Sequence, residues 1–327
     1  MIFSWNDIDQ IKFEKILKAL DKTILESDEI NDFFFEGANL KDNPSLLKKA
    51  KLLKKEAYLK DEYALKVQPK EIKKGNLFLH YKNYFPYEGF IYDEISVNTK
   101  NYQESTPLGY FDCDFPFLAL EENDETWMSI IPHEINTMKE AIKEATGTVL
   151  TLGLGLGYFT FHALRKKEVK KVIVSEREKK IISLFKENLL PFFDNKEKLE
   201  IIEGDAFSFL NTCPKVDYIF ADLWHQPEDG LPLYLLLNKF EERVPAKWVY
   251  WIENSMLALL RRSLIILVDE ERHGSTDINY QKEANLGDKI INRLHFLLKE
   301  EKINSIGDLH RFLSISYLKG IAKKLVL

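Results

Sequence analysis

Apolar residues recur every three to five positions between residues 8 and 20, and five leucines between residues 46 and 59 repeat the pattern. This spacing is typical of helices with one buried face, so we predict helices from residue 5 to about residue 74. Residues 41–74 hold eleven lysines and five acids. We interpret this charge as a solvated helix face whose lysine stems cover apolar surface, with an anion or nucleic-acid patch as the alternative.

The pattern of residue types changes between Asn76 and Met128, where runs of aromatic and β-branched residues are broken by prolines and asparagines. Such runs predict several short strands, paired antiparallel. Pro132 then marks the start of a helix that carries an acid in its first turn and stops before Gly147. A β-rich segment therefore follows the N-terminal helices, and one helix leads out of it.

From Thr148 to Glu253 the period alternates between strand and helix. Alternation of this kind predicts parallel strands joined by right-handed crossovers, which is an open α/β sheet. After Glu253 the pattern is helical almost to the end. We therefore expect three regions, 1–128 (helical, then β-rich), 129–253 (open sheet) and 254–327 (helical extension). The predicted strands of the sheet are 149–152, 169–174, 199–202, 216–221 and 248–252.

Composition narrows the function classes. The 327 residues carry 46 Lys+Arg against 52 Asp+Glu, a net charge of −6, which argues against a whole-surface nucleic-acid binder. The two cysteines, Cys113 and Cys213, form no CxxC pattern, so we expect neither a disulfide framework nor a metal site. The N-terminus does not resemble a signal peptide, and two arginines interrupt the most apolar segment, residues 256–268. A cytoplasmic protein without a membrane partner is expected.

The strongest chemical signal is a buried strand that leads into three alternating glycines, Gly153, Gly155 and Gly157, and then into a helix. Glycines there let the backbone turn tightly and approach a ligand at the helix N-terminus. In the dinucleotide pattern G-x-G-x-x-G/A, Tyr158 or Thr160 would stand where a small residue is needed. Since no Gly-Lys-Ser/Thr follows either, nicotinamide and nucleoside-triphosphate cofactors are disfavoured.

Two carboxylates follow the next two predicted strands. Glu176 stands nineteen residues after Gly157 at a strand tip, where an acid can accept hydrogen bonds from both ribose hydroxyls. Asp205 follows the third strand, where it can accept from the exocyclic amino group of a base. Both have plainer interpretations, as a surface acid near a helix start for Glu176 and as a helix cap for Asp205.

The glycine loop, Glu176 and Asp205 follow one another along the chain in the order of the cofactor sites of class I S-adenosylmethionine-dependent methyltransferases. Over about residues 130–253 the chain resembles that superfamily. The resemblance implies a Rossmann-like, mainly parallel sheet with S-adenosylmethionine bound across the strand tips. It also implies that the glycine loop, with Tyr158 beside it, holds the methionine part of that cofactor. By the same likeness Glu176 binds the ribose, and Asp205 with Ala206 binds the adenine. The acid that the family often has two residues before the first glycine is replaced by Thr151.

Within the superfamily the chain is most similar to the spermidine synthase-like branch. The similarity lies in the string 204–207, in the Pro-His-Glu helix and in the β-rich segment ahead of the sheet. That branch includes aminopropyltransferases that use decarboxylated S-adenosylmethionine. Two acids of those synthases are absent, because Leu156 stands in the glycine loop and His225 after the fourth strand. A cationic polyamine needs carboxylates to bind it, so these departures disfavour amine transfer.

Candidate substrate-handling residues follow the fourth strand, where open α/β sheets bind their ligands. Asp222 and His225 are the candidate catalytic bases, and Trp224 can face a sulfonium through a cation–π contact. Trp127, upstream of the sheet, is a candidate pocket residue in a segment that folds over the cofactor. The plainer alternatives are an exposed loop histidine for His225 and a buried junction residue for Trp127.

We therefore predict a methyltransferase that uses S-adenosylmethionine and an in-line displacement on a small-molecule acceptor. The sequence does not identify the acceptor. Nucleic acid is disfavoured as a partner and stays open only through the lysine-rich segment 41–74. The alternatives are an aminopropyltransferase and a non-catalytic S-adenosylmethionine-binding module. The module is favoured by the helical residues 254–327, which stand where the superfamily normally completes its sheet with a hairpin.

Overall fold

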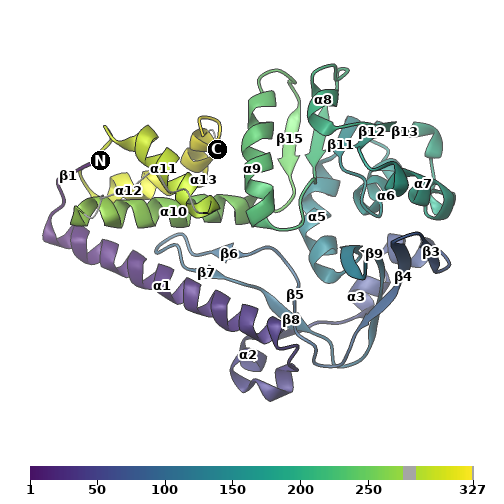
Figure 1. The fold of residues 1–327 in the computed structure, drawn as a ribbon, viewed down its shortest axis with the longest axis horizontal. Helices are drawn as coiled ribbons and strands as arrows, with labels where there is room; N and C mark the ends of the chain where they lie inside the picture. The colour runs from purple at the N-terminus through teal and green to yellow at the C-terminus, as the bar shows by residue number, and fades with distance from the viewer. Residues whose placement is uncertain (275–284, 326–327) are drawn as a thin grey trace.

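The computed structural model describes residues 1–274 and 285–325 (Figure 1). After the short strand β1 (Ile2–Phe3), helix α1 (Asp7–Phe35) runs for 29 residues along one side of the molecule. A capping box starts it: the Asn6 side chain accepts from the Asp9 N–H at 2.9 Å, and the Asp9 carboxylate accepts from the Asn6 N–H. The predicted first helix is thus present.

The continuation of that helical pattern to residue 74 is wrong, since the structure breaks it into short pieces. Asn43 and Asp61 each accept a backbone N–H at the start of a new helix, which ends the previous run. The pieces are η1 (Leu40–Asp42), α2 (Pro44–Lys49), β2 (Lys51–Leu52), α3 (Glu56–Leu59), α4 (Glu62–Lys66) and β3 (Ile72–Lys74).

The predicted antiparallel strands form a four-stranded sheet in the order β10–β9–β4–β3. Its long members are β4 (Leu77–Tyr84), β9 (Phe115–Glu122) and β10 (Glu125–Ser129). Strand β10 carries Trp127 and leads directly into helix α5 (Pro132–Glu144). The smaller strands are β5 (Phe90–Ile91), β6 (Ser96–Val97), β7 (Glu104–Ser105) and β8 (Leu108–Tyr110).

The central sheet has five parallel strands in the order β13–β12–β11–β14–β15. Strand β14, inside the sheet, is a continuous apolar run that is buried throughout, as parallel strands covered on both faces are. The chain winds outward from β11 to β13 and then returns to place β14 against β11, which makes a topological switch point. This order confirms the predicted Rossmann-like α/β class. The elements are β11 (Gly147–Leu152), α6 (Tyr158–Arg165), β12 (Val169–Glu176), α7 (Lys179–Asn188), η2 (Leu190–Phe192), η3 (Lys196–Lys198), β13 (Leu199–Glu203), α8 (Ala206–Leu210), β14 (Tyr218–Ala221), α9 (Pro227–Leu237), η4 (Asn238–Phe240) and β15 (Lys247–Tyr250).

A helical extension follows β15, as predicted. It consists of α10 (Glu253–His273), α11 (Leu286–Leu298), β16 (Lys302–Ile303), α12 (Ile306–Phe312) and α13 (Ile315–Ala322). Within the described ranges β15 is an edge strand, and no hairpin joins it. Strand β16 pairs in parallel with β1, so the N-terminal residues lie against the helical extension in the arm at the left of Figure 1.

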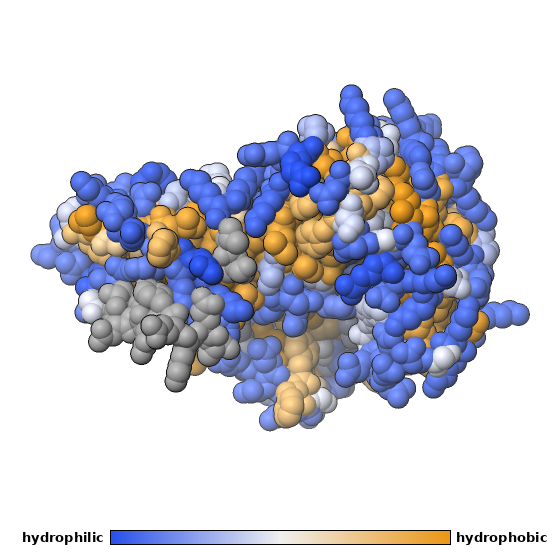
Figure 2. Space-filling view, turned by 45° about the horizontal axis from the view of Figure 1, so that its top comes forward, coloured by the Kyte–Doolittle hydropathy of each residue, from blue (hydrophilic) through white to orange (hydrophobic). Residues whose placement is uncertain are grey.

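One hydrophobic cluster runs through all three regions, from Phe13 in α1 to Leu264 in α10. The proposed boundaries at 128 and 253 stay a prediction. On the face seen in Figure 2, hydrophilic residues cover most of the surface, with apolar residues exposed between them. Among the described helices none has the length and apolarity to span a membrane.

Candidate functional site

The three glycines after β11 all have backbone angles in the left-handed region, with φ of 95° at Gly153, 56° at Gly155 and 79° at Gly157. A Cβ atom at Gly153 would lie 2.1 Å from the Asp222 carbonyl oxygen, and one at Gly157 would lie 2.5 Å from the Phe185 ring. At Gly155 the only atom of the described residues within 4 Å of such a Cβ is the Met128 sulfur, 3.8 Å away. The outer glycines are therefore required by packing, whereas the middle one leaves open space beside the loop.

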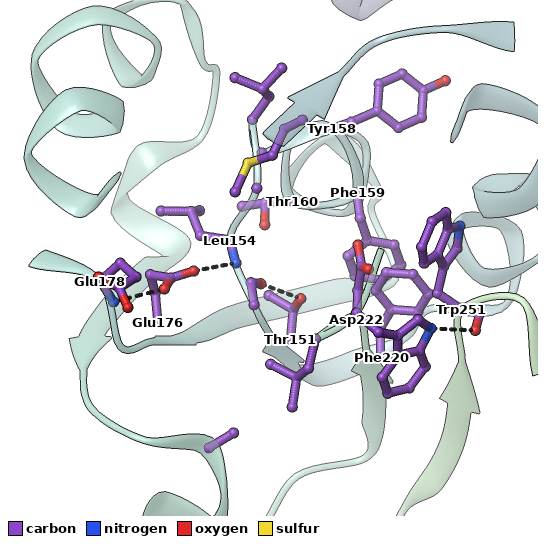
Figure 3. Close-up of a pocket in the computed structure, with 18 of the residues that line it drawn as sticks. Thr151, Leu154, Tyr158, Phe159, Thr160, Glu176, Glu178, Phe220, Asp222 and Trp251 are labelled. Atoms are coloured by element: carbon purple, nitrogen blue, oxygen red, sulfur yellow. Dashed lines mark hydrogen bonds between the residues drawn. The ribbon is translucent and has the colours of Figure 1, made fainter. Parts of the chain in front are cut away.

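Glu176, at the tip of β12, ties this loop to the neighbouring strand. Its carboxylate accepts the Leu154 N–H at 3.1 Å and the Glu178 N–H at 2.8 Å (Figure 3). The hydroxyl of Thr151 donates to the Gly153 carbonyl at 3.1 Å, so this side chain is used inside the loop. A carboxylate has about four acceptor positions, so Glu176 keeps acceptor capacity for a ligand.

Asp205 follows β13 and caps the short helix α8. One of its oxygens accepts the Ser208 N–H at 2.8 Å. This is the helix-capping role that the sequence offered as the alternative for Asp205. In the described part of the chain its second oxygen forms no hydrogen bond. Ala206 is buried directly behind it.

Asp222 follows β14 and is half-buried, beside Phe220 and Trp251 (Figure 3). Burial raises the pKa of this carboxyl well above its usual range, and the charges of Glu134 and Glu176 raise it further. Carboxylates from α5, β12 and the end of β14 thus act on one another across a single space. Such a cluster favours a cationic ligand, because a positive charge relieves the repulsion.

These residues line one cavity of about 440 Å³ at the carboxyl ends of the parallel strands. Its volume falls within the roughly 300–1,000 Å³ of small-molecule sites, and its place is the one where open α/β sheets bind ligands. Every site residue named from the sequence borders it: Trp127, Gly153, Gly155, Gly157, Tyr158, Glu176, Asp205, Ala206, Asp222, Trp224 and His225.

Three of these side chains are engaged elsewhere. The Tyr158 ring points away from Glu176 (Figure 3), and its hydroxyl donates to Asp61 at 3.0 Å. Trp224 is 4% exposed, and its indole N–H donates to the Trp251 carbonyl at 3.2 Å. His225 has a side chain that is 61% exposed and lies 3.4 Å from an Asp229 oxygen. Trp224 is thus mainly a packing residue, and His225 stands at the rim.

Trp127 lies on β10 and is half-buried, with the Lys180 ammonium 5.0 Å from its ring centroid. Beside it, Met128 reaches over Gly155. Strand β10 therefore forms a wall of the cavity, on the side where the sequence predicted a covering segment.

Sequence reasoning missed Glu134 and Trp251 as cavity residues. Glu134 stands in the first turn of α5, and that position was noted only as a helix-start signal. Trp251 follows β15 as Asp222 follows β14, but the predicted strand 248–252 included it, because the structure ends β15 at Tyr250. Its indole N–H donates to the Thr137 hydroxyl at 2.8 Å, which fixes the ring against α5.

No family model matches the chain, and no curated protein matches it. Similar solved structures include spermidine synthase from Thermotoga maritima, which is 12% identical over 60% of this chain and 71% of its own, with a TM-score of 0.33. A dimethyladenosine transferase from Plasmodium falciparum is 27% identical over 35% of this chain and 38% of its own, with a TM-score of 0.25. A precorrin 8W decarboxylase from Methanobacterium thermoautotrophicum is 20% identical over 34% of this chain, with a TM-score of 0.27.

The chain spans 56% of the length of that decarboxylase, less than two thirds. Solved structures similar to this chain include methyltransferases and spermidine synthases, in agreement with the resemblance in the sequence. At these TM-scores the likeness carries no argument about function. The fold class rests on the strand order of the central sheet.

Proposed function

We propose that the cavity binds S-adenosylmethionine and that the protein is a methyltransferase. The observation that carries the proposal is that the glycine loop and the carboxylates of Glu134, Glu176 and Asp222 all line one space at the switch point of the sheet. A sulfonium and an ammonium group both carry positive charge, which fits these carboxylates. Thr151 stands where class I methyltransferases often have an acid, and the carboxylate of Glu134 supplies the negative charge that is missing there.

The adenosyl part fits the residues on the side of β12 and β13. Glu176 has acceptor positions left for the ribose hydroxyls. The second oxygen of Asp205 is available to the exocyclic amino group of adenine. The open space at Gly155 lets the ligand approach the loop backbone closely.

S-adenosylmethionine supplies a methyl group on a sulfonium, and its transfer is an in-line displacement. The chain's own contribution is therefore mainly to hold the acceptor in line. An acceptor that carries a proton also needs a base. Asp222 is the candidate, because its raised pKa brings a carboxylate closer to the range in which a general base is effective at neutral pH.

The test is a calorimetric titration of the full chain with S-adenosylmethionine, S-adenosylhomocysteine and decarboxylated S-adenosylmethionine. We expect binding of the first two, and a loss of about tenfold or more in Glu176→Gln, which removes one charged acceptor. Glu203→Gln is the matched control: Glu203 pairs with Glu176 in register at the tip of β13, is exposed and does not line the cavity.

Preference for the decarboxylated compound would favour an aminopropyltransferase over the proposed methyltransferase. Failure of all three to bind would refute the proposal. Binding of S-adenosylmethionine with no turnover on any amine, hydroxyl or thiol acceptor would leave the non-catalytic module.

A further inference from the structure

A second cavity, of about 600 Å³, lies in the helical arm between α1, the turn that joins β6 to β7, and α12. This arm is at the opposite end of the molecule from the parallel sheet (Figure 1). The cavity shares no lining residue with the candidate active site. Its polar lining consists of Lys12, Lys15, Asn98, Lys100, Asn101 and His310.

The lysines of this cleft are not in ion pairs with neighbouring acids of the described residues. Lys12, Lys15 and Lys100 form no ion pair with any residue of 1–274 or 285–325. The nearby acids are used elsewhere: Asp9 accepts the Asn6 and Ile306 N–H groups, and Asp308 caps α12 and pairs with Arg311. No aspartate or glutamate lines the cleft.

The two asparagines present donors to the cleft. The side-chain oxygen of Asn98 accepts the Lys100 N–H at 2.9 Å, and that of Asn101 accepts the Gln103 N–H at 3.2 Å. Each oxygen thus has one acceptor position used within the turn, and the two amide NH₂ groups, which form no hydrogen bond with a described residue, can donate to a ligand.

His310 is the polar side chain that α12 adds to the cleft. The hydroxyl of Tyr102 lies 2.7 Å from its Nδ1 and 3.4 Å from its backbone carbonyl, to which it can donate, so either ring nitrogen can carry the proton. Burial, followed by the charge of Lys12, lowers the pKa of His310, so the ring is neutral at neutral pH. Behind Tyr102 lies the buried guanidinium of Arg261, 5.7 Å from the ring centroid, which adds further positive charge.

We propose that this cleft is a binding site for phosphate groups, such as the diphosphate of a nucleotide. Helix α1 and the turn between β6 and β7 bring three ammonium groups and two amide groups to one space, α12 adds the imidazole of His310, and no aspartate or glutamate is in the lining. A diphosphate carries several charges and many acceptor oxygens, which suits lysines acting as point charges around it. A nucleotide and a nucleic-acid backbone share this phosphate chemistry. The inference is independent of the proposed methyltransferase activity.

The test is calorimetry of the full chain at low ionic strength with three probes: inorganic pyrophosphate, ADP and a short single-stranded RNA. The variant is K12Q/K15Q, and the control is K18Q/K22Q, which removes the same charge from exposed positions of the same helix outside the cleft. We expect pyrophosphate to bind the wild type, about tenfold or more weaker binding in K12Q/K15Q, and a change of less than about twofold in the control.

The two sources of phosphate are distinguished by the other probes. ADP binding that matches pyrophosphate supports a free nucleotide, whereas tighter RNA binding that is lost in K12Q/K15Q and falls steeply with salt supports a nucleic-acid backbone. If pyrophosphate, ADP and RNA all fail to bind, or if both double variants weaken binding equally, the site does not exist. S-adenosylhomocysteine titrated into the same variants reports separately on the candidate active site.

Discussion

The glycine loop is held from behind by the N-terminal helices, and this contact can be tested by removing one hydroxyl. Tyr63, on α4, is 1% exposed, and its hydroxyl donates to the carbonyl of Leu156 at 2.6 Å. Leu156 stands between the second and third glycines of the loop. Burial raises the pKa of Tyr63, so the phenol stays protonated and remains a donor.

Tyr63→Phe deletes this hydrogen bond and leaves the ring in place. Deleting one partner of a buried hydrogen bond costs about 1–3 kcal/mol, so the free energy of unfolding should fall by about that amount. If about 1 kcal/mol of the bond's contribution holds the loop in its ligand-binding conformation, S-adenosylhomocysteine should bind about fivefold more weakly.

Tyr218→Phe is the matched control, because Tyr218 is fully buried and its hydroxyl donates to the Ala141 carbonyl at 2.8 Å, outside the loop. Urea unfolding and calorimetric titration of both variants give the two quantities. Comparable losses of stability, with weaker ligand binding in Tyr63→Phe alone, are expected. Wild-type affinity in Tyr63→Phe, or equal weakening in both variants, would refute the idea that α4 positions the loop.

Three further predictions concern the cavity. Because burial and then neighbouring carboxylates raise the pKa of Asp222, the folded protein binds that proton more tightly than the unfolded chain, and stability falls as pH rises above the unfolded pKa of about 4. Asp222→Asn should therefore unfold at higher urea concentration than the wild type at pH 7, with the difference shrinking towards pH 4, while turnover is lost; equal midpoints at pH 7 would contradict this. Gly155→Ala should lower the free energy of unfolding by about 1–2 kcal/mol, from its left-handed backbone alone. Gly157→Ala should lower it by about 1–3 kcal/mol more, because the added methyl group overpacks against Phe185. Thermal unfolding should therefore give a lower midpoint for Gly157→Ala, and coincident midpoints would contradict this. His225→Ala, at an exposed side chain 3.4 Å from Asp229, should change the free energy of unfolding by less than about 0.5 kcal/mol, and a larger loss in chemical denaturation would mean that the histidine packs more tightly than described.

The sheet and its loop were predictable because their signals are local. The apolar runs of β11 and β14, the glycines between β11 and α6, and acids directly after strands each lie within a few residues of one another. Parallel strands place their carboxyl ends at one edge, so local signals were enough to bring Glu176, Asp205 and Asp222 to one cavity.

The rest depends on contacts between distant parts of the chain, which periodicity does not encode. Tyr63 meets Leu156 across 93 positions, and Tyr158 turns its hydroxyl to Asp61 across 97. Its position after the loop predicts Tyr158 beside the cofactor, but in the structure its hydroxyl donates to Asp61 in the N-terminal region. Glu134 could not be recognised for the same reason, because only the packing of α5 brings its first turn to the strand tips.

The most direct test of the central claim is a crystal structure of the protein with S-adenosylhomocysteine bound. The account predicts the ribose hydroxyls within about 3.2 Å of the Glu176 carboxylate and the adenine amino group beside Asp205. Density for the ligand at any other place on the molecule, or adenosine in the cavity without contact to either carboxylate, would contradict it.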